Sequence, residues 1–150
     1  MALRVHILAC ALLLAVIAAP RAFAIELEPG TWQDSETGMA NGIPAKPKVS
    51  TDCVTAEDAK DPVKSLSKMQ AEGAGQCKTL DVKQNGNVVA LTMQCGDEKQ
   101  GSVALAGTFT FIDRKHYTSS MKSTISFGGQ KMTADMQTDS KWIATECKKK

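Results

Sequence analysis

A single histidine, His116, follows the N-terminal segment and is the first candidate for acid–base chemistry. A nucleophilic serine would need this base within hydrogen-bond reach, and a third group would have to orient the base. Ser119 and Ser120 are the nearest hydroxyls in sequence, but an extended strand points Ser119 to the opposite face. Ser120 shares the face of His116 and lies two strand repeats away, about 13 Å at the standard rise. We therefore expect a solvated strand histidine and assign no catalytic residue, with a hydrolase-like enzyme kept as an alternative.

Four methionines are the second candidate, because soft thioethers can bind Cu(I). All four occupy inward positions of the expected strands: Met93, Met121, Met132 and Met136. No histidine joins them on that face, and methionine also fills irregular gaps in a core with few aromatic side chains. We expect packing to be their role, with Cu(I) binding as an alternative function. We expect no other metal site and no cofactor.

Cysteines are the third reactive group, at Cys53, Cys77, Cys95 and Cys147 after the N-terminal segment. An even number of cysteines behind an export signal indicates two disulfides formed in an oxidising compartment, with three possible pairings. Zinc is the competing use of four cysteines, but no C-x-x-C pair is present to favour it.

The N-terminal segment MALRVHILACALLLAVIAAPRAFA has the order of a secretory signal peptide. Arg4 precedes an apolar run from Ile7 to Ala19, and Ala22-Phe23-Ala24 matches an A-x-A cleavage site. We therefore expect residues 1–24 to be removed and residues 25–150 to form a single exported domain. The apolar run is too short to span a bilayer comfortably, so we do not expect an integral membrane protein.

The charge balance excludes one class of partner. The chain has 18 basic and 16 acidic residues, but Arg4 and Arg21 belong to the expected signal peptide, so the remaining domain is formally neutral. A neutral domain lacks the basic surface that nucleic-acid binding requires. We expect no nucleic-acid partner.

Apolar and polar residues alternate with a period of two from Lys78 onward, which predicts half-buried antiparallel strands. Three turns then fix which residues lie opposite each other. A turn at Asn85-Gly86 would pair Val82 with Val89 and Leu80 with Leu91. A turn at Asp113–Lys115 would pair Phe111 with Tyr117. A turn at Gly128-Gly129 would pair Ile125 with Met132 and Met121 with Met136. All three turns put apolar residues on one face. We therefore predict a five-stranded antiparallel meander, strongly curved or forming a partial barrel, around one shared dry interior.

A helical insertion precedes these strands. Thr55 is an N-cap candidate, and Asp61-Pro62 reads as the end of one helix and the start of another. We therefore predict one short kinked helical segment over about residues 55–70. Upstream, the stretch EPGTWQDSET predicts a strand with Trp32 as a core anchor.

The insertion and the first hairpin together favour one disulfide pairing. A Cys53–Cys77 bridge would fasten the helical segment to the sheet at both ends. The register of the Asn85-Gly86 hairpin places Cys77 and Cys95 on opposite faces. We therefore favour Cys53–Cys77 with Cys95–Cys147, and keep the other two pairings open.

With these elements in place, the chain resembles domain-of-unknown-function family 3617, a family of small exported bacterial proteins. The resemblance rests on EPGTW, CVTAEDAKDP, QCKTLDVKQNGNVVALTMQC and the terminal KWIATEC, and covers essentially all of the chain after the signal peptide. It implies a bacterial periplasmic setting. It brings no activity, cofactor or site residue with it.

These observations together favour a non-enzymatic function. A curved meander capped by a helix could enclose a small apolar molecule, and a filled core fits the same pattern. We predict a periplasmic small-ligand-binding or envelope-associated module whose partner is a small apolar ligand or an envelope component.

Overall fold

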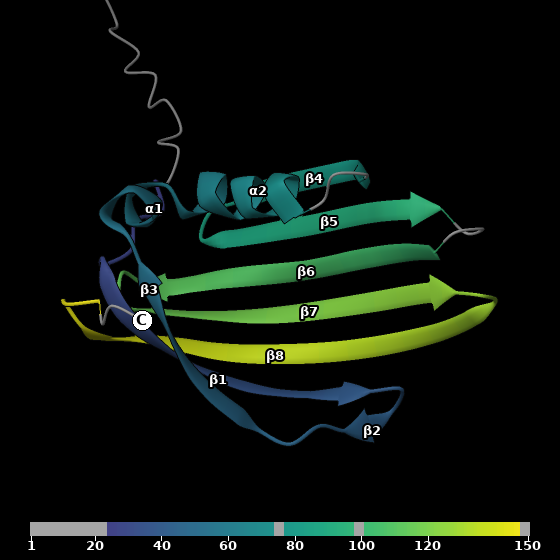
Figure 1. The fold of residues 1–150 in the computed structure, drawn as a ribbon. Coiled ribbons are helices and arrows are strands. Elements are labelled where there is room, and N and C mark those ends of the chain that lie inside the picture. The colour runs from purple at the N-terminus through teal and green to yellow at the C-terminus, as the bar shows by residue number, and fades with distance from the viewer. Residues whose placement is uncertain (1–23, 74–76, 98–100, 148–150) are drawn as a thin grey trace, which may run out of the picture.

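The computed structural model describes residues 24–73, 77–97 and 101–147, which form one curved sheet with two short helices (Figure 1). The elements are β1 (Gly30–Ala40), β2 (Ile43–Pro44), β3 (Lys48–Val54), α1 (Ala56–Lys60), α2 (Pro62–Gly73), β4 (Cys77–Asn85), β5 (Val88–Asp97), β6 (Gly101–Asp113), β7 (His116–Phe127) and β8 (Gln130–Ala144). The expected signal peptide lies outside the described residues, except for Ala24. Within the described ranges, no helix is long and apolar enough to cross a membrane.

The strands form an eight-stranded antiparallel sheet in the order β2-β1-β8-β7-β6-β5-β4, and β3 also pairs with β1. Strands β4 to β8 follow one another as the predicted meander, and β1 extends the sheet beyond β8. The order does not return to its first strand, so the sheet is open rather than a closed barrel. The prediction of a mainly β, antiparallel, curved meander with a small helical insertion is therefore confirmed.

The strand registers confirm two of the three predicted turns. Phe111 lies opposite Tyr117, Ile125 lies opposite Met132, and Met121 lies opposite Met136. The first hairpin is displaced by two residues from the prediction, because its loop is Gly86-Asn87 and Val82 lies opposite Leu91.

The neighbouring strand explains the displaced hairpin. The Asn87 side-chain amide donates to the carbonyl of Phe111 at 2.9 Å, and the Phe111 N–H donates to the Asn87 carbonyl at 2.9 Å. Both bonds hold Asn87 in the loop. Because the displacement is an even number of residues, the side chains from Thr79 to the hairpin loop keep their predicted faces.

The predicted disulfide pairing is wrong. The bridges are Cys53–Cys147 and Cys77–Cys95. A β-bulge between Cys77 and Thr79 inserts one extra residue into β4, which turns Cys77 to the side of Cys95. A uniform hairpin register cannot show such a bulge, and this is why the two cysteines were expected on opposite faces.

The helical insertion is two helices rather than one kinked helix. Thr55 caps α1 as predicted, with its Oγ1 accepting from the backbone N–H of Asp58 at 3.2 Å. The Asp61 carboxylate accepts from the N–H of Lys64 at 2.9 Å and so caps α2, whose first residue is Pro62. In Figure 1, α2 passes in front of β4 and β5.

The core lies at one end of the sheet, which we call the proximal end: β1 begins there, and the β4–β5 and β6–β7 turns lie there. Its buried apolar residues are Leu27, Trp32, Ala59, Val89 and Phe111. The backbone N–H of Leu27 donates to the carbonyl of Ala59 at 2.8 Å, which joins the N-terminal segment to α1. The opposite end, with the β1–β2 and β7–β8 turns, is the distal end.

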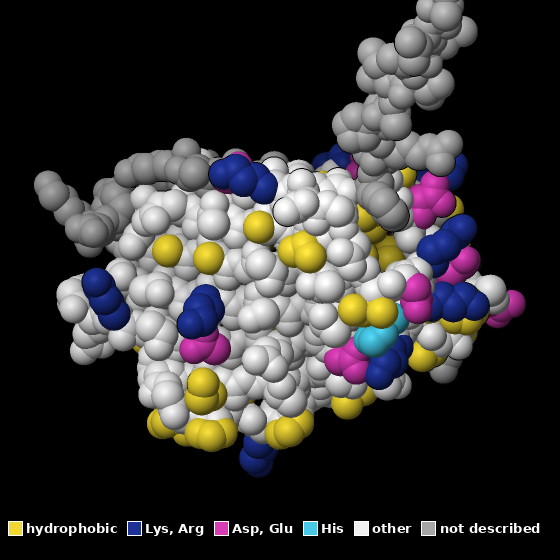
Figure 2. All heavy atoms as spheres, turned by 180° about the vertical axis from the view of Figure 1, so that it is seen from behind, with side chains coloured by type: hydrophobic (Ala, Val, Ile, Leu, Met, Phe, Trp, Pro, Cys, Tyr) yellow, Lys and Arg dark blue, Asp and Glu magenta, His cyan; other side chains and the backbone are white. Residues whose placement is uncertain are grey.

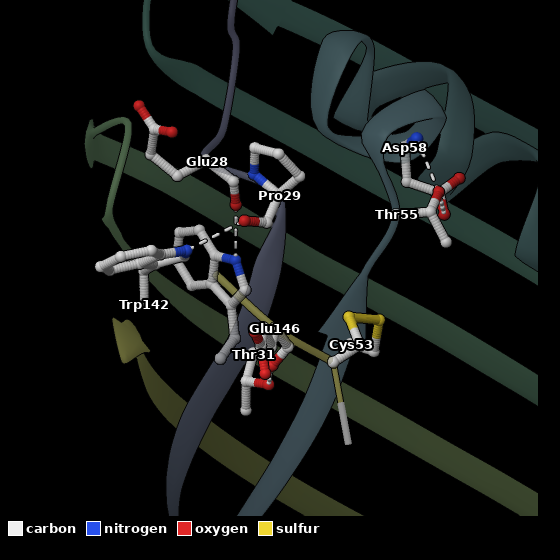
Figure 3. Close-up of a disulfide and its surroundings, with 10 residues drawn as sticks. Glu28, Pro29, Thr31, Cys53, Thr55, Asp58, Trp142 and Glu146 are labelled. Carbon is white, nitrogen blue, oxygen red and sulfur yellow. Dashed lines mark hydrogen bonds between the residues drawn. A yellow bond between two sulfur atoms is a disulfide. The ribbon is translucent and has the colours of Figure 1, made fainter. Parts of the chain in front are cut away.

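Polar contacts close the proximal end around the first disulfide (Figure 3). The indole N–H of Trp142 donates to the carbonyl of Pro29 at 3.1 Å, and the Thr31 hydroxyl donates to the carbonyl of Glu146 at 2.5 Å. The Cys53–Cys147 bridge joins the end of β3 to the segment after β8. Strand β1, which lies between them, is thereby held on both sides.

Candidate functional site

The sheet has two chemically different faces. Residues paired in register share a face, so the face of Trp32 and Phe111 can be followed from strand to strand. We call it the inner face, because α1 packs on it through the buried Ala59. The opposite, outer face carries mainly serine, threonine and charged side chains. Figure 2 views the molecule from the side opposite to Figure 1 and shows charged side chains gathered around the histidine at one end, with fewer over the rest of the face.

The inner face carries large apolar side chains at both ends, but only those of the proximal end are buried. Four large hydrophobic residues at the distal end are exposed: Ile125 by 40%, Phe127 by 70%, Met132 by 50% and Met136 by 41%. We call these four residues the distal patch. Half-buried Val103 lies opposite Ile125 and continues the patch onto β6. The predicted shared face is thus present, but the prediction that it forms one dry interior is wrong for this half.

The distal half of the inner face is exposed because the elements that cover the proximal half do not reach it. In the buried cluster, the described side chains that come from outside the sheet belong to Ile25, Leu27, Ala59 and Val63. All four precede β4 in the chain, and their cluster with Trp32 lies at the proximal end. Alternation in a strand assigns a side chain to a face, and only a second layer can remove that face from water. Ile125 and Met132 therefore stay exposed although the sequence pattern places them correctly.

The structure brings two of the four methionines together, and a third lies farther along the same face of β8. Met121 and Met136 are direct cross-strand neighbours, and Met132 is the next inward residue of β8 beyond Ala134. Met93 lies opposite Leu105 of β6 and is separated from the others by that strand. The sulfur of Met121 occupies the space beside Gly107, where a side chain would collide with it. Met121 therefore has a packing role, and Cu(I) binding stays a prediction.

His116 pairs with acidic and basic neighbours at the proximal end of the outer face. Its Nε2 lies 2.6 Å from Oδ1 of Asp139, and the Lys141 ammonium lies 2.7 Å from Oδ2. Hydrogen bonds from Lys141 and His116 lower the pKa of Asp139 below its usual value. Ser120, the serine on the same face, lies opposite Gln137, whereas His116 lies opposite Lys141. The arrangement is a surface charge cluster that the register keeps apart from Ser120.

A shallow depression of about 420 Å³ lies beside this cluster on the outer face. Hydroxyl side chains line most of it: Ser35, Thr37, Thr108, Thr110, Thr118 and Ser120, together with Gln137 and Asp139. It is shallow and open to solvent, so it does not enclose a ligand. The alternation of threonine and serine at outward positions is the signal that sequence reasoning left unused.

Sequence reasoning also missed a polar group on the inner face, where Asp34 lies opposite Ser140, and Ser140 lies opposite Tyr117. Ser140 is fully buried, and neither its Oγ nor Oδ1 of Asp34 has a hydrogen-bond partner. Burial raises the pKa of both Asp34 and Tyr117, and the nearby Ser140 hydroxyl lowers both. The Ser140 hydroxyl is thus within reach of both Asp34 and Tyr117, although its hydrogen bonds to them are not well aligned.

Further charges surround Asp34. Asp52 of β3 and Glu36 of β1 raise the pKa of Asp34, and Lys48 lowers it. The Lys48 ammonium lies 3.6 Å from a Glu36 oxygen. We call Asp34, Glu36, Asp52 and Ser140 the Asp34 cluster. Its signal in the sequence is the run Trp-x-Asp-x-Glu from Trp32, in which carboxylates follow a core tryptophan on one face of a strand.

The Asp34 cluster and the distal patch follow one another along the inner face. In β8, the inward residues run from Ser140 through Thr138 to Met136, and in β1 from Asp34 through Glu36 to Gly38. Each step is about 7 Å at the standard rise. The inner face therefore changes from buried aromatic core, to a carboxylate group, to exposed apolar surface.

Comparison with known proteins places the chain in one family. No curated protein and no solved structure matches it. One family model matches residues 27–147, which span every strand and helix of the fold and all four cysteines of the two bridges. The chain belongs to the family described as protein of unknown function DUF3617.

Proposed function

We propose that this protein is an exported, non-enzymatic module that binds a small apolar molecule on the distal half of its inner face. The observation that supports the proposal most strongly is the distal patch. Its four exposed side chains lie on one face of two paired strands, on the same face as the buried core and beyond the polar Thr138–Ser119 level. Single exposed hydrophobic residues are ordinary on protein surfaces, whereas contiguous ones mark binding sites.

The energetics favour an occupant on this surface. Fully burying a side chain such as Ile, Phe or Met stabilises by about 1.5–3 kcal/mol relative to exposure. The patch residues retain between 40% and 70% of their exposure, so a bound apolar molecule would recover a large share of that free energy. Met132 and Met136 are also flexible enough to adapt to different ligand shapes.

The two disulfides support the exported setting. Both bridges close within the chain, which is typical of proteins that fold in an oxidising compartment. The N-terminal segment, with its basic start, apolar run and A-x-A site, agrees with the same compartment. We propose the periplasm as the place of action.

Dye titration tests the proposal. Full-length mature protein is titrated with N-phenyl-1-naphthylamine, an apolar dye whose emission rises in apolar surroundings. We expect saturable binding that weakens about tenfold in the double variant Ile125→Ser/Met132→Ser, because two opposed apolar side chains of the patch are lost. The matched control is Ile112→Ser, which removes another exposed isoleucine (54%, against 40% for Ile125) at the proximal end of β6. Equal weakening in both variants, or no saturable binding by the wild type, would contradict the proposal.

Cu(I) binding is the second candidate, because Met121 and Met136 are adjacent. The variant Met121→Leu/Met136→Leu separates it from the first. Leucine keeps the apolar surface but removes the thioethers, so dye binding should persist. Cu(I) affinity that falls in this variant would favour the copper function, and unchanged Cu(I) affinity would end it.

A further inference from the structure

Resting on the proposed function, we infer that the molecule bound on the inner face is an amphiphile with a cationic nitrogen head group, and that the Asp34 cluster receives this head. The apolar tail then lies along the distal patch. The inference assigns a chemical class to the ligand, which the apolar patch alone does not do.

Placement along the strands is the first argument. The Asp34 cluster and the distal patch share a face, and only the Glu36–Thr138 level separates Asp34 from the level of Met136. At the standard strand rise, Asp34 and Met136 differ by about 13 Å along the sheet. Ser119 lies opposite Thr138 and continues a polar strip onto β7. A molecule with one polar end and one apolar end therefore matches the order of side chains.

Charge is the second argument. Within the described strands, Lys48 is the only cation at a position of the inner face, and it is already paired with Glu36 at 3.6 Å. Asp34 and Asp52 add two further carboxylates close to it. A positively charged head is attracted to this group, whereas a carboxylate head is repelled by it.

Unpartnered polar atoms are the third and independent argument. Oδ1 of Asp34 and Oγ of Ser140 are both buried and lack hydrogen-bond partners. Ser140 is fully buried and lies directly opposite Asp34, on the same face as the patch. Buried polar atoms are nearly always well paired in native proteins, and the Ser140 hydroxyl, although close to Asp34, makes no well-aligned hydrogen bond to it, so the carboxylate can accept from a further donor. An ammonium is a donor with no acceptor, which is what a carboxylate requires.

Calorimetry with decyl compounds tests the inference. The mature wild-type chain is titrated at pH 7 with decylammonium and with decanoate, both below their micelle concentrations. We expect decylammonium to bind about tenfold more tightly than decanoate, because the tails are identical and only the head charge differs. In Asp34→Asn the preference should fall to about threefold or less, because the amide keeps the shape but loses the charge. The matched control Asp81→Asn, on β4, removes an acid that is paired with Lys83 away from the patch and should keep the full preference.

The outcomes separate this inference from the proposed function. If decanoate binds as tightly as decylammonium, the head-group assignment is wrong and the proposed apolar site stands. If neither compound nor the naphthyl dye binds, the proposed function itself fails. If the preference survives in Asp34→Asn and also in Glu36→Gln, the head lies elsewhere and the Asp34 cluster is not its site. Thermal unfolding of each variant verifies that a lost preference does not come from an unfolded chain.

Discussion

The proximal and distal halves of the inner face share one sequence pattern and differ in what lies over them. At the proximal end Trp32 is 1% exposed, with Leu27 and Ala59 in the same buried cluster. At the distal end Phe127 and Met132 keep half or more of their exposure, although they occupy equivalent inward positions. The comparison shows that strand alternation specifies a face, whereas the length of the covering segment decides how much of that face is dry. Here the covering segment stops short, and the exposed half is available for binding.

Replacing one aromatic residue at each end of the inner face should give the largest difference in the free energy of unfolding. Trp32→Ala should lower the free energy of unfolding by about 3–5 kcal/mol, because it leaves a cavity in the buried cluster and frees the Glu28 carbonyl that accepts from its indole at 2.9 Å. Phe127→Ala should change it by about 0.5 kcal/mol or less, because Phe127 is exposed. Urea unfolding followed by circular dichroism measures both. Similar losses at the two ends would contradict the contrast.

Removing the proximal disulfide should likewise lower the free energy of unfolding more than removing the other one. Replacing Cys53 and Cys147 by alanine should lower the free energy of unfolding by about 2–4 kcal/mol, because that bridge closes a separation of 94 residues at the proximal end. Replacing Cys77 and Cys95 should cost about 1.5 kcal/mol less in the chain-entropy model, because their separation is 18 residues. Urea unfolding of the two double variants compares them. A larger loss from the second pair would show that the bulge in β4 matters more than loop closure.

Asp34 should destabilise the fold at neutral pH. Burial raises its pKa above the usual value of 3.8, so the folded state holds the proton more tightly than the unfolded state. The free energy of unfolding therefore falls as the pH rises from 3.8 through the raised folded pKa, and stays lower above it. Asp34→Asn should stabilise the protein at pH 7 by on the order of 0.5 kcal/mol, a small value because Asp34 is only half-buried.

Unfolding measured at pH 7 and at pH 3 checks this prediction. The advantage of Asp34→Asn should shrink at pH 3, where the wild-type carboxyl is protonated in both states. A variant that is less stable than the wild type at pH 7 would contradict the account of Asp34 as an unpartnered carboxylate.

The smallest effect is expected at Asp139 on the outer face. Lys141 and His116 lower its pKa, so its contribution is present above pH 3.8 and is lost as the pH falls through the depressed folded value. Asp139→Asn should lower the free energy of unfolding at pH 7 by about 0.5 kcal/mol or less, since exposed ion pairs are worth little. The difference from the wild type should disappear in acid. An effect above 1 kcal/mol, on the order of a buried pair, would mean that this cluster is more than a surface ion pair.

The sequence was sufficient for the sheet and insufficient for its local irregularities. The turns at Gly128-Gly129 and before His116 pair the strands as predicted, because turn chemistry and alternation agree there. The pairing of Cys77 with Cys95 was missed because it depends on one bulged residue, which no alternation pattern shows. The first hairpin was displaced because a hydrogen bond to Phe111, distant in sequence, decides which residues form its loop.

Only part of the candidate site could be predicted, because alternation assigns side chains to a face but does not show what covers that face. Inward positions of Ile125, Met132 and Met136 follow from period-two alternation, so the apolar surface itself was expected. Its exposure depends on which strands the Leu27 segment, α1 and α2 cover, which is a tertiary property. The Asp34 cluster draws on β1, β3 and β8, and no local motif joins those strands.

Methyl NMR during a ligand titration tests the central claim most directly. Isoleucine and methionine methyl groups of the mature chain are labelled, and decylammonium is added below its micelle concentration. The methyl signals of Ile125, Met132 and Met136 should shift together and saturate, whereas those of Ile112 and Ile143, which are exposed at the proximal end, should stay in place. Shifts at Ile112 and Ile143 as large as those at Ile125, or none at the distal patch, would contradict the claim that the open half of the inner face is the binding surface.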